Sequence, residues 1–212
     1  MGRITKSVLF MFVTTLIFTS LVTGVKILNQ DRIQRNREAK LQETVLDVLG
    51  LNTKNLRTPE EISILYKNRI KQKKLAGRII YVCHAEDGKT VTGYAFPVDG
   101  PGFWGAVYAM VAIDPGATRI LGVSFYSHSE TPGLGGRISE PWFTGQFKDL
   151  SLALGENEKQ YFYLVPEGDR KRKNDLDAIT GASRTSDAVE TFLNREVRIV
   201  VKEIIHAKEA YK

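Results

Sequence analysis

An uncharged apolar stretch at the start of the chain most constrains the fold. Residues 7–25 carry no charged side chain and include Val8–Val13, Leu16–Phe18, Leu21 and Val22. A helix over this stretch would be roughly 28 Å long, at about 1.5 Å of rise per residue, close to the hydrocarbon thickness of a bilayer. A terminal helix that is apolar on every side has no solvated face, which disfavours a buried core helix. The sequence therefore predicts a transmembrane anchor over residues 1–25.

The anchor is predicted to remain uncleaved. The apolar stretch is longer than the apolar core of a typical signal peptide, and no small-residue cleavage site follows it. Its orientation is not fixed by charge, because basic residues lie on both sides of the stretch. Those before it are Arg3 and Lys6, and those after it are Lys26, Arg32, Arg35 and Arg37.

The charge and the metal-binding residue types exclude some functions. The 212 residues include 30 Lys and Arg against 24 Asp and Glu, a net charge of +6. These basic residues are spread along the chain, with no dense run longer than Arg170–Lys173, so no nucleic acid partner is expected. Cys83 is the single cysteine and cannot form an internal disulfide. The three histidines are far apart, and no metal site is predicted.

After the anchor the sequence predicts an α+β domain with a mainly antiparallel sheet and flanking helices. Residues 26–57 are predicted to be a helical connector, with a helix over 30–49 that stops at Gly50. The domain, residues 58–212, opens with a helix start at Thr58-Pro59-Glu60-Glu61 and apolar positions Ile62, Leu65 and Ile70. Strands and helices that do not strictly alternate favour the α+β class. The strands are predicted at 78–85, 90–98, 106–113, 119–128 and 161–165, a short helix at 141–147, and an amphipathic helix at 186–208.

A glycine-rich loop spans Glu130–Arg137. Three glycines and Pro132 let its backbone turn sharply and come close to a flat ligand. Leu134 is its only large apolar side chain. This leucine either packs into the core or forms a wall for an apolar ligand, and composition alone favours a structural turn.

A second loop, Asp177–Ser186, directly precedes the last predicted helix. Small hydroxyl residues around Gly181 at a helix start can form an anion site, because the first backbone N–H groups are unpaired and the helix dipole favours negative charge. Arg184 would add positive charge. Taken alone, this loop favours a simple N-cap by Ser183, Thr185 or Ser186 over phosphate binding.

Together the two loops resemble a known family, the FMN-binding subunits of two membrane redox complexes. These complexes are the Na⁺-translocating NADH:quinone reductase and the related Rnf electron-transport complex. The family marks, E-T-P-G-L-G and a later D-x-x-(S/T)-G-A-(S/T), stand here as Glu130–Gly135 and Asp177–Ser183. The spacing between the motifs and the single N-terminal anchor also match.

The resemblance implies a covalent cofactor. It implies that flavin mononucleotide (FMN) is joined through its phosphate to the hydroxyl of Ser183, where the family usually has threonine. Serine offers the same oxygen, but no activating base lies nearby in the sequence, so a flavin transferase is implied for maturation.

The resemblance also implies the remaining cofactor-binding residues. Thr131 and Leu134 would lie against the isoalloxazine ring, and Glu130 would hold the loop or meet the polar edge of the ring. Trp104 either lies near the flavin or is a core tryptophan, and the sequence favours neither of these two interpretations. The other implied residues are Gly135, Gly181 and Ala182, with Asp177 and Thr180 as recognition and loop-shaping residues.

The function that follows from the resemblance is electron transfer. We predict a membrane-bound, FMN-carrying subunit of an ion-translocating NADH:quinone or ferredoxin:NAD oxidoreductase, with its domain on the extracytoplasmic side of the cell membrane. Its partners would be the other subunits of that complex, the flavin transferase and the membrane. No catalytic residue and no nicotinamide site is predicted in this chain. The alternatives are a stand-alone extracytoplasmic flavoprotein electron carrier and a flavin-free, membrane-tethered sensor or assembly module.

Overall fold

The computed structural model describes residues 2–51, 53, 56, 58–75, 77–154 and 159–209, without the side chains of Lys208 and Glu209. The chain forms two compact units, Met1–Leu41 and Gln42–Lys212. Parts of the predicted connector (52, 54, 55 and 57) and of the predicted domain (76, 155–158 and 210–212) lie outside the described residues. The domain boundaries predicted at residues 25 and 57 remain predictions.

The first unit contains helix α1 (Arg3–Leu28) and most of helix α2 (Gln30–Val48). No residue of α1 is buried. Among the described residues, α1 is the one helix long and apolar enough to cross a membrane. The two helices are separated by Asn29, whose carboxamide donates a hydrogen bond to the carbonyl of Val25 at 2.8 Å. The helix predicted over residues 30–49 is confirmed.

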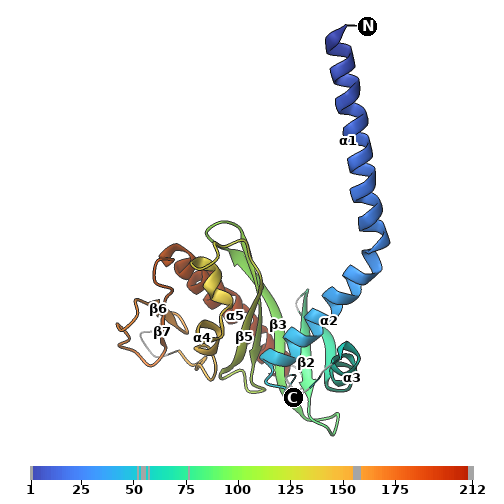
Figure 1. Ribbon diagram of the computed structural model, residues 1–212. Coiled ribbons are helices and arrows are strands. Elements are labelled where there is room, and N and C mark those ends of the chain that lie inside the picture. Colours follow the sequence, from blue (N-terminus) through green and yellow to red (C-terminus); the bar gives the residue numbers. More distant parts are fainter. Residues whose placement is uncertain are drawn as a thin grey trace. The chain divides into compact units, whose positions relative to one another are not determined.

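The second unit is built on a five-stranded antiparallel sheet (Figure 1). Its strands follow one another in space as they do in the chain, so each neighbouring pair is joined by a short connection. They are β1 (Ile70–Leu75), β2 (Arg78–His84), β3 (Val91–Pro101), β4 (Ala106–Ile113) and β5 (Ile120–Ser127). The other elements are α3 (Pro59–Arg69), η1 (Gly135–Ser139), α4 (Pro141–Gly145), β6 (Tyr163–Val165), β7 (Asp175–Asp177) and α5 (Ser183–Glu209). The α+β class is confirmed.

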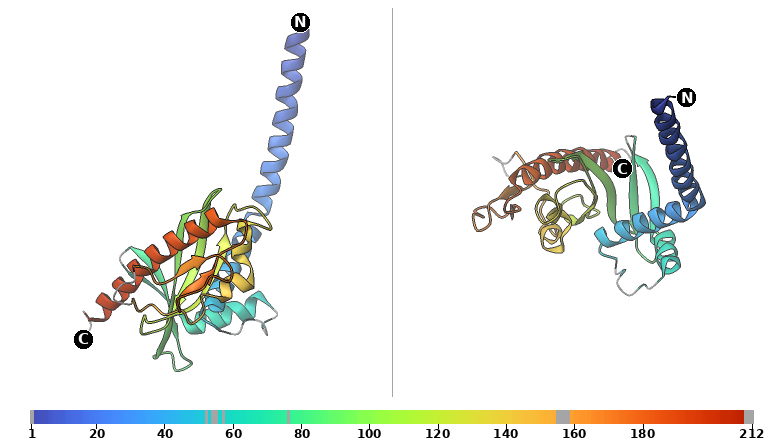
Figure 2. Two further views of the ribbon diagram at one scale, coloured as in Figure 1. Left: turned by 90° about the vertical axis from the view of Figure 1, so that its left-hand side faces the viewer. Right: turned by 45° about the horizontal axis from the view of Figure 1, so that its top comes forward.

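The two faces of the sheet pack against different layers. Along β4, alternate side chains enter one core (Val107, Ala109, Val111 and Ile113), and the side chains between them enter the other (Met110 and Ala112). The first core contains the buried face of α5, which crosses that side of the sheet (Figure 2). The second contains the last turns of α2 and Tyr66 of α3. Since a strand alternates its side chains between faces, β4 is buried on both sides.

Helix α5 positions the second loop on the sheet. The apolar face of this predicted amphipathic helix is buried at Val189, Phe192, Leu193, Val197, Val200, Val201 and Ile204, whereas Ile205 is 40% exposed. The helix approaches β3 so closely that a Cβ on Gly100 would lie 2.3 Å from Phe192 Cβ. It begins at Ser183, three residues before the predicted start. The first turn of α5 is therefore part of the second loop motif.

The predicted start of α3 is confirmed, but its predicted apolar position Ile70 is not helical. The Thr58 hydroxyl accepts a hydrogen bond from Glu61 N, and the Glu61 carboxylate accepts one from Thr58 N, both at 3.3 Å. The helix ends at Arg69, and Ile70 begins β1. This strand was not predicted because three of its six residues are exposed lysines, which are common on edge strands.

A half-buried carboxylate between α5 and β6 makes the stability of the second unit depend on pH. Glu190 Oε2 accepts a hydrogen bond from Leu164 N at 2.5 Å. Burial raises the pKa of Glu190. The folded state therefore holds this proton more tightly than the unfolded state does, and stability falls as the pH rises from the ordinary glutamate pKa to the raised one.

We therefore expect Glu190→Gln to raise the melting temperature at pH 7, because glutamine keeps an oxygen acceptor for Leu164 N and carries no charge. The gain should shrink at pH 4, where the wild-type carboxylate is largely protonated. Thermal unfolding of both proteins at the two pH values measures this. A variant whose advantage is larger at pH 4 than at pH 7 would contradict the assignment.

Candidate functional site

The first loop connects β5 to η1. Leu134 N and Gly136 N donate hydrogen bonds to the carbonyl of Thr131, at 3.2 and 2.9 Å, and close a tight turn. Gly133 within this turn has φ +75°, a conformation that glycine adopts without strain. Gly135 lies so close to α5 that a Cβ there would come within 2.5 Å of Thr185 Oγ1. The glycines are therefore required by the turn and by close packing.

A chain of side-chain hydrogen bonds fixes this loop to β5. Glu130 N donates to His128 Nδ1 at 3.3 Å, and His128 Nε2 lies 3.0 Å from the hydroxyl of Ser139. The same hydroxyl donates to the carbonyl of Phe125 at 3.1 Å. Because Nδ1 accepts a hydrogen bond, the neutral imidazole carries its proton on Nε2.

The second loop runs from the end of β7 into α5. Ala182 N donates to the carbonyl of Ile179 at 2.9 Å, across a turn in which Gly181 has φ +79°. The buried hydroxyl of Ser186 accepts a hydrogen bond from Ile179 N at 3.0 Å and donates to the carbonyl of Ala182. The Ser186 hydroxyl thus holds the turn together by hydrogen bonds to its backbone, whereas Ser183 is exposed.

Glu130 joins the two loops to a third segment. Its side chain is almost fully buried, with the residue 4% exposed. Oε1 accepts hydrogen bonds from Phe103 N at 2.8 Å and Trp104 N at 3.0 Å. Oε2 accepts one from the Thr185 hydroxyl at 2.6 Å. Both carboxylate oxygens therefore accept hydrogen bonds from the protein itself. Of the two roles considered for Glu130, holding the loop or meeting the polar edge of the ring, these contacts correspond to the first.

These three segments surround a cavity of about 400 Å³. This volume is in the range of small-molecule and cofactor sites. Large apolar side chains line it and remain partly exposed, with Leu134 at 45%, Phe103 at 47% and Trp104 at 66%. The other lining residues are Glu130, Thr131, Gly135, Gly181, Ala182, Ser183, Arg184 and Thr185.

Ser183 is the first residue of α5 and is exposed. In the part of the chain that the structure describes, its hydroxyl makes no hydrogen bond. The first turn of α5 contains no acidic residue, so the helix dipole and unpaired N–H groups present a positive end to this corner of the cavity. Arg184 adds a cation, with its guanidinium carbon 5.8 Å from the centre of the Phe103 ring.

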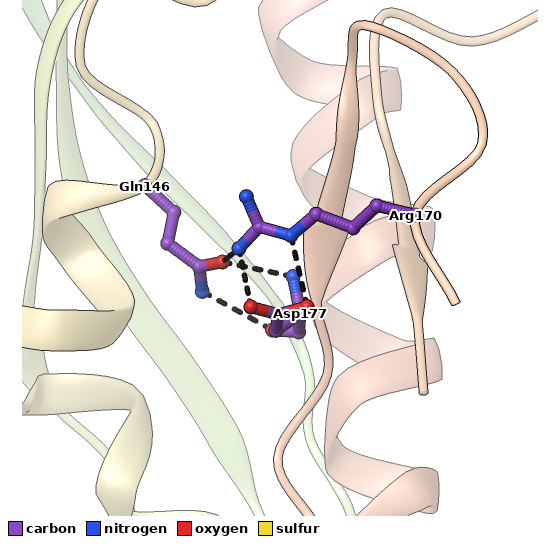
Figure 3. Close-up of polar contacts among 3 residues, drawn as sticks. All are labelled: Gln146, Arg170 and Asp177. Carbon is purple, nitrogen blue, oxygen red and sulfur yellow. Dashed lines mark hydrogen bonds and ion pairs between the residues drawn. The ribbon is translucent and has the colours of Figure 1, made fainter. Parts of the chain in front are cut away.

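The structure brings most of the predicted site residues together at this cavity. Asp177 and Thr180 do not line it. Asp177 instead binds Gln146 and Arg170 (Figure 3), and Thr180 is an exposed residue of the turn. Three lining residues were not predicted as cofactor contacts: Phe103, Arg184 and Thr185. Phe103 and Arg184 adjoin predicted positions in the sequence and Thr185 lies two residues from one, and only the folded structure shows that they share the cavity.

The cavity has the features that an FMN would need. The partly exposed apolar walls suit a flat, largely apolar ring, and an unpaired hydroxyl beside a positive helix end suits its phosphate. Close packing of Gly135 against Thr185 leaves no room for a Cβ and brings the first loop against the start of α5. No group of three or more metal-ligating side chains occurs among the described residues.

The comparisons with known proteins point to the same cofactor. A family model described as the FMN-binding domain matches residues 102–197. The NqrC protein of the Na⁺-translocating NADH-quinone reductase of Neisseria meningitidis serogroup B is 34% identical over 111 residues, which cover 52% of this chain and 42% of that relative. NqrC of Vibrio campbellii is 32% identical over 116 residues, which cover 53% of this chain and 42% of that relative. The chain thus matches less than half the length of these relatives.

Two crystal structures share the fold. NqrC from Parabacteroides distasonis has a TM-score of 0.67 at 22% identity, covering 82% of this chain and 96% of that one. NqrC of Shewanella oneidensis has a TM-score of 0.63 at 20% identity, covering 73% of this chain and 89% of that one. The cavity and both loops lie within residues 102–197, the segment that matches the FMN-binding domain, and the chain is similar to NqrC proteins of Na⁺-translocating NADH-quinone reductases over about half of its length.

Proposed function

We propose that this protein is a membrane-anchored electron-transfer subunit that carries FMN bound covalently through its phosphate to Ser183. The observation that carries the proposal is the position of this hydroxyl. It is exposed, it makes no hydrogen bond to the described residues, and it lies at the wall of the cavity on the first residue of a long helix. A phosphodiester formed there would be stabilised by the helix N-terminus and by Arg184.

The attachment is a phosphoryl transfer to an alcohol. The Ser183 oxygen forms a bond to the phosphorus of FMN, the hydroxyl proton is released, and a leaving group departs from the same phosphorus. An alcohol requires an activated donor for this step, so we propose a pyrophosphate ester of FMN such as FAD, from which AMP leaves. Since no described side chain binds the Ser183 hydroxyl as a base, a flavin transferase would supply that base.

The residues of the chain would then bind and orient the cofactor. Leu134, Phe103 and Trp104 would cover the ring with apolar surface, and the first N–H groups of α5 would hold the phosphate. Glu130 would keep the three segments at a fixed separation. When bound, FMN supplies one- and two-electron redox chemistry. A covalent bond retains the cofactor regardless of its free concentration.

We place the protein in a membrane complex. Helix α1 would span the bilayer, and the FMN domain would lie on the extracytoplasmic side. The similarity to NqrC supports a place among the other subunits of a Na⁺-translocating NADH:quinone reductase. The resemblance of the two loop motifs to the FMN-binding subunit of the Rnf complex makes that complex the alternative. Purification from native membranes distinguishes this from a stand-alone carrier, because a component of the complex would purify together with the other integral-membrane redox proteins.

The test of the attachment is peptide mapping of the full-length protein produced together with a flavin transferase. Trypsin releases the peptide Asn174–Arg184, which contains the hydroxyls of Thr180 and Ser183. We expect this peptide to gain the mass of FMN less one water, with fragmentation placing the addition on Ser183. An unmodified peptide from protein that has met an active transferase, or an addition on Thr180, would reject the proposal.

A further inference from the structure

Three side chains from separate segments form a cluster at the start of the second loop: Gln146, Arg170 and Asp177 (Figure 3). Asp177 N donates to Gln146 Oε1 at 2.8 Å, and Gln146 Nε2 donates to the carbonyl of Asp177 at 3.1 Å. Arg170 Nε donates to Asp177 Oδ1 at 2.8 Å, and Arg170 Nη2 binds both Asp177 Oδ2 and Gln146 Oε1. The backbone and the carboxylate of Asp177 are thus held by two side chains.

The cluster connects the two loops that form the cavity. Gln146 directly follows α4, which follows η1 and the first loop. Asp177 ends β7, where Ala178 N donates to the carbonyl of Val165 at 2.8 Å. The turn that leads to Ser183 begins just after this point, at Ile179. By pairing with both backbone groups of Asp177, Gln146 fixes the start of this turn relative to the segment that carries the first loop.

Arg170 supplies the second half of the connection. A guanidinium can bind both oxygens of a carboxylate in one plane, which fixes orientation as well as distance. Its side chain is 44% exposed and that of Asp177 25% exposed, so water screens much of the attraction between the charges. Such an exposed pair contributes little to global stability, and its effect is to hold geometry locally.

We propose that Gln146 and Arg170 are positioning residues for the attachment of FMN to Ser183. In this proposal the role of Asp177 in the second loop motif is to bind these two side chains and so to anchor the turn that leads to Ser183. The proposal rests on the proposed function. It differs from direct recognition, in which the transferase would bind the Asp177 carboxylate itself. In the folded protein that carboxylate is already occupied by Arg170, so direct recognition would require Arg170 to be displaced.

The two explanations predict opposite results for Arg170→Ala. If Asp177 anchors the turn, then Arg170→Ala, Gln146→Ala and Asp177→Asn should each slow attachment. If the transferase binds the carboxylate, Asp177→Asn should slow attachment, whereas Arg170→Ala frees the carboxylate and should leave the rate unchanged or raise it.

The experiment uses the full-length apo protein in detergent with a purified flavin transferase and FAD. Intact mass spectrometry measures the initial rate of FMN incorporation at several concentrations of the acceptor protein. We expect each of the three variants to lower kcat by about tenfold or more, with a smaller change in KM, because a misplaced nucleophile reacts slowly after it is bound. The double variant Gln146→Ala/Arg170→Ala should react at about the rate of the slower single variant, because the two substitutions disrupt the same hydrogen-bond network.

Arg119→Ala is the matched control. Arg119 and Asp149 form an exposed pair at 2.5 Å in the same domain, and neither residue lines the cavity. Its rate should stay within about twofold of wild type, and its melting temperature should match that of Arg170→Ala. If Arg170→Ala does not fold, Arg170→Lys takes its place. Lysine keeps the charge but cannot form the two-point contact, so it should also be slow.

The outcomes separate this proposal from the one on which it rests. Wild-type attachment rates for Arg170→Ala and Arg170→Lys, with Ser183→Ala unlabelled, would overturn the positioning role and leave attachment at Ser183 intact. No labelling of the wild type by an active transferase, or equal labelling of Ser183→Ala, would overturn the proposed function itself.

Discussion

Ser183→Ala is expected to abolish covalent FMN while leaving the fold intact. Alanine has no oxygen to join to the phosphate, so the loss should be complete. Ser183 is exposed and makes no hydrogen bond to the described residues, so the free energy of unfolding should change by less than about 0.5 kcal/mol. Flavin fluorescence of the denatured band after electrophoresis measures the first effect, and thermal unfolding of the apo protein measures the second.

Two further variants make this result specific. Ser183→Thr introduces the residue that the resemblance implies at this position, keeps the hydroxyl, and should be labelled at least as well as the wild type. Thr191→Ala removes another exposed hydroxyl of α5, one that donates to the carbonyl of Asp187 and lies outside the cavity, and should be labelled normally. A fluorescent Ser183→Ala band would show that the cofactor is attached elsewhere.

Glu130→Ala should have the second large effect, on both stability and cofactor attachment. The substitution leaves Phe103 N, Trp104 N and the Thr185 hydroxyl without their common acceptor in a buried position. At about 1 kcal/mol or more for each unpaired donor, the cost is about 3 kcal/mol. For a domain of this size that corresponds to a fall in melting temperature of about 10 °C. The three segments around the cavity would also lose their common connection, and attachment of FMN should fall by more than tenfold.

Glu130→Gln provides the matched control. Its amide oxygen can still accept from Phe103 N and Trp104 N, and the Thr185 hydroxyl can turn to accept from the amide nitrogen. We expect a loss of about 1 kcal/mol and FMN attachment close to that of the wild type. Thermal unfolding and the fluorescence assay measure both variants. If Glu130→Ala is as stable as Glu130→Gln, the carboxylate does not hold these segments together.

The elements predicted well are those whose cause is local. The capping box at Thr58 and Glu61 needs only residues three apart, and the buried face of α5 follows from its helical periodicity. Strand β1 was missed because its burial pattern, with only its first residue fully buried, gives no period-two signal. The short strand β7 was missed because its pairing with β6 is parallel and three residues long, so that it depends on tertiary packing.

By itself the sequence determined the anchor-like helix, the α+β class and the two loops that carry the site, because apolar runs, caps and glycine turns act over a few residues. The tertiary structure alone decided what these loops do together. It paired Glu130 with Thr185 across 55 residues and Gln146 with Asp177 across 31. It also placed Ser183 in the lining of the cavity and left Asp177 outside that lining. Such contacts join residues that are distant in the chain, and only the packing of α5 and α4 on the sheet brings them within hydrogen-bonding distance.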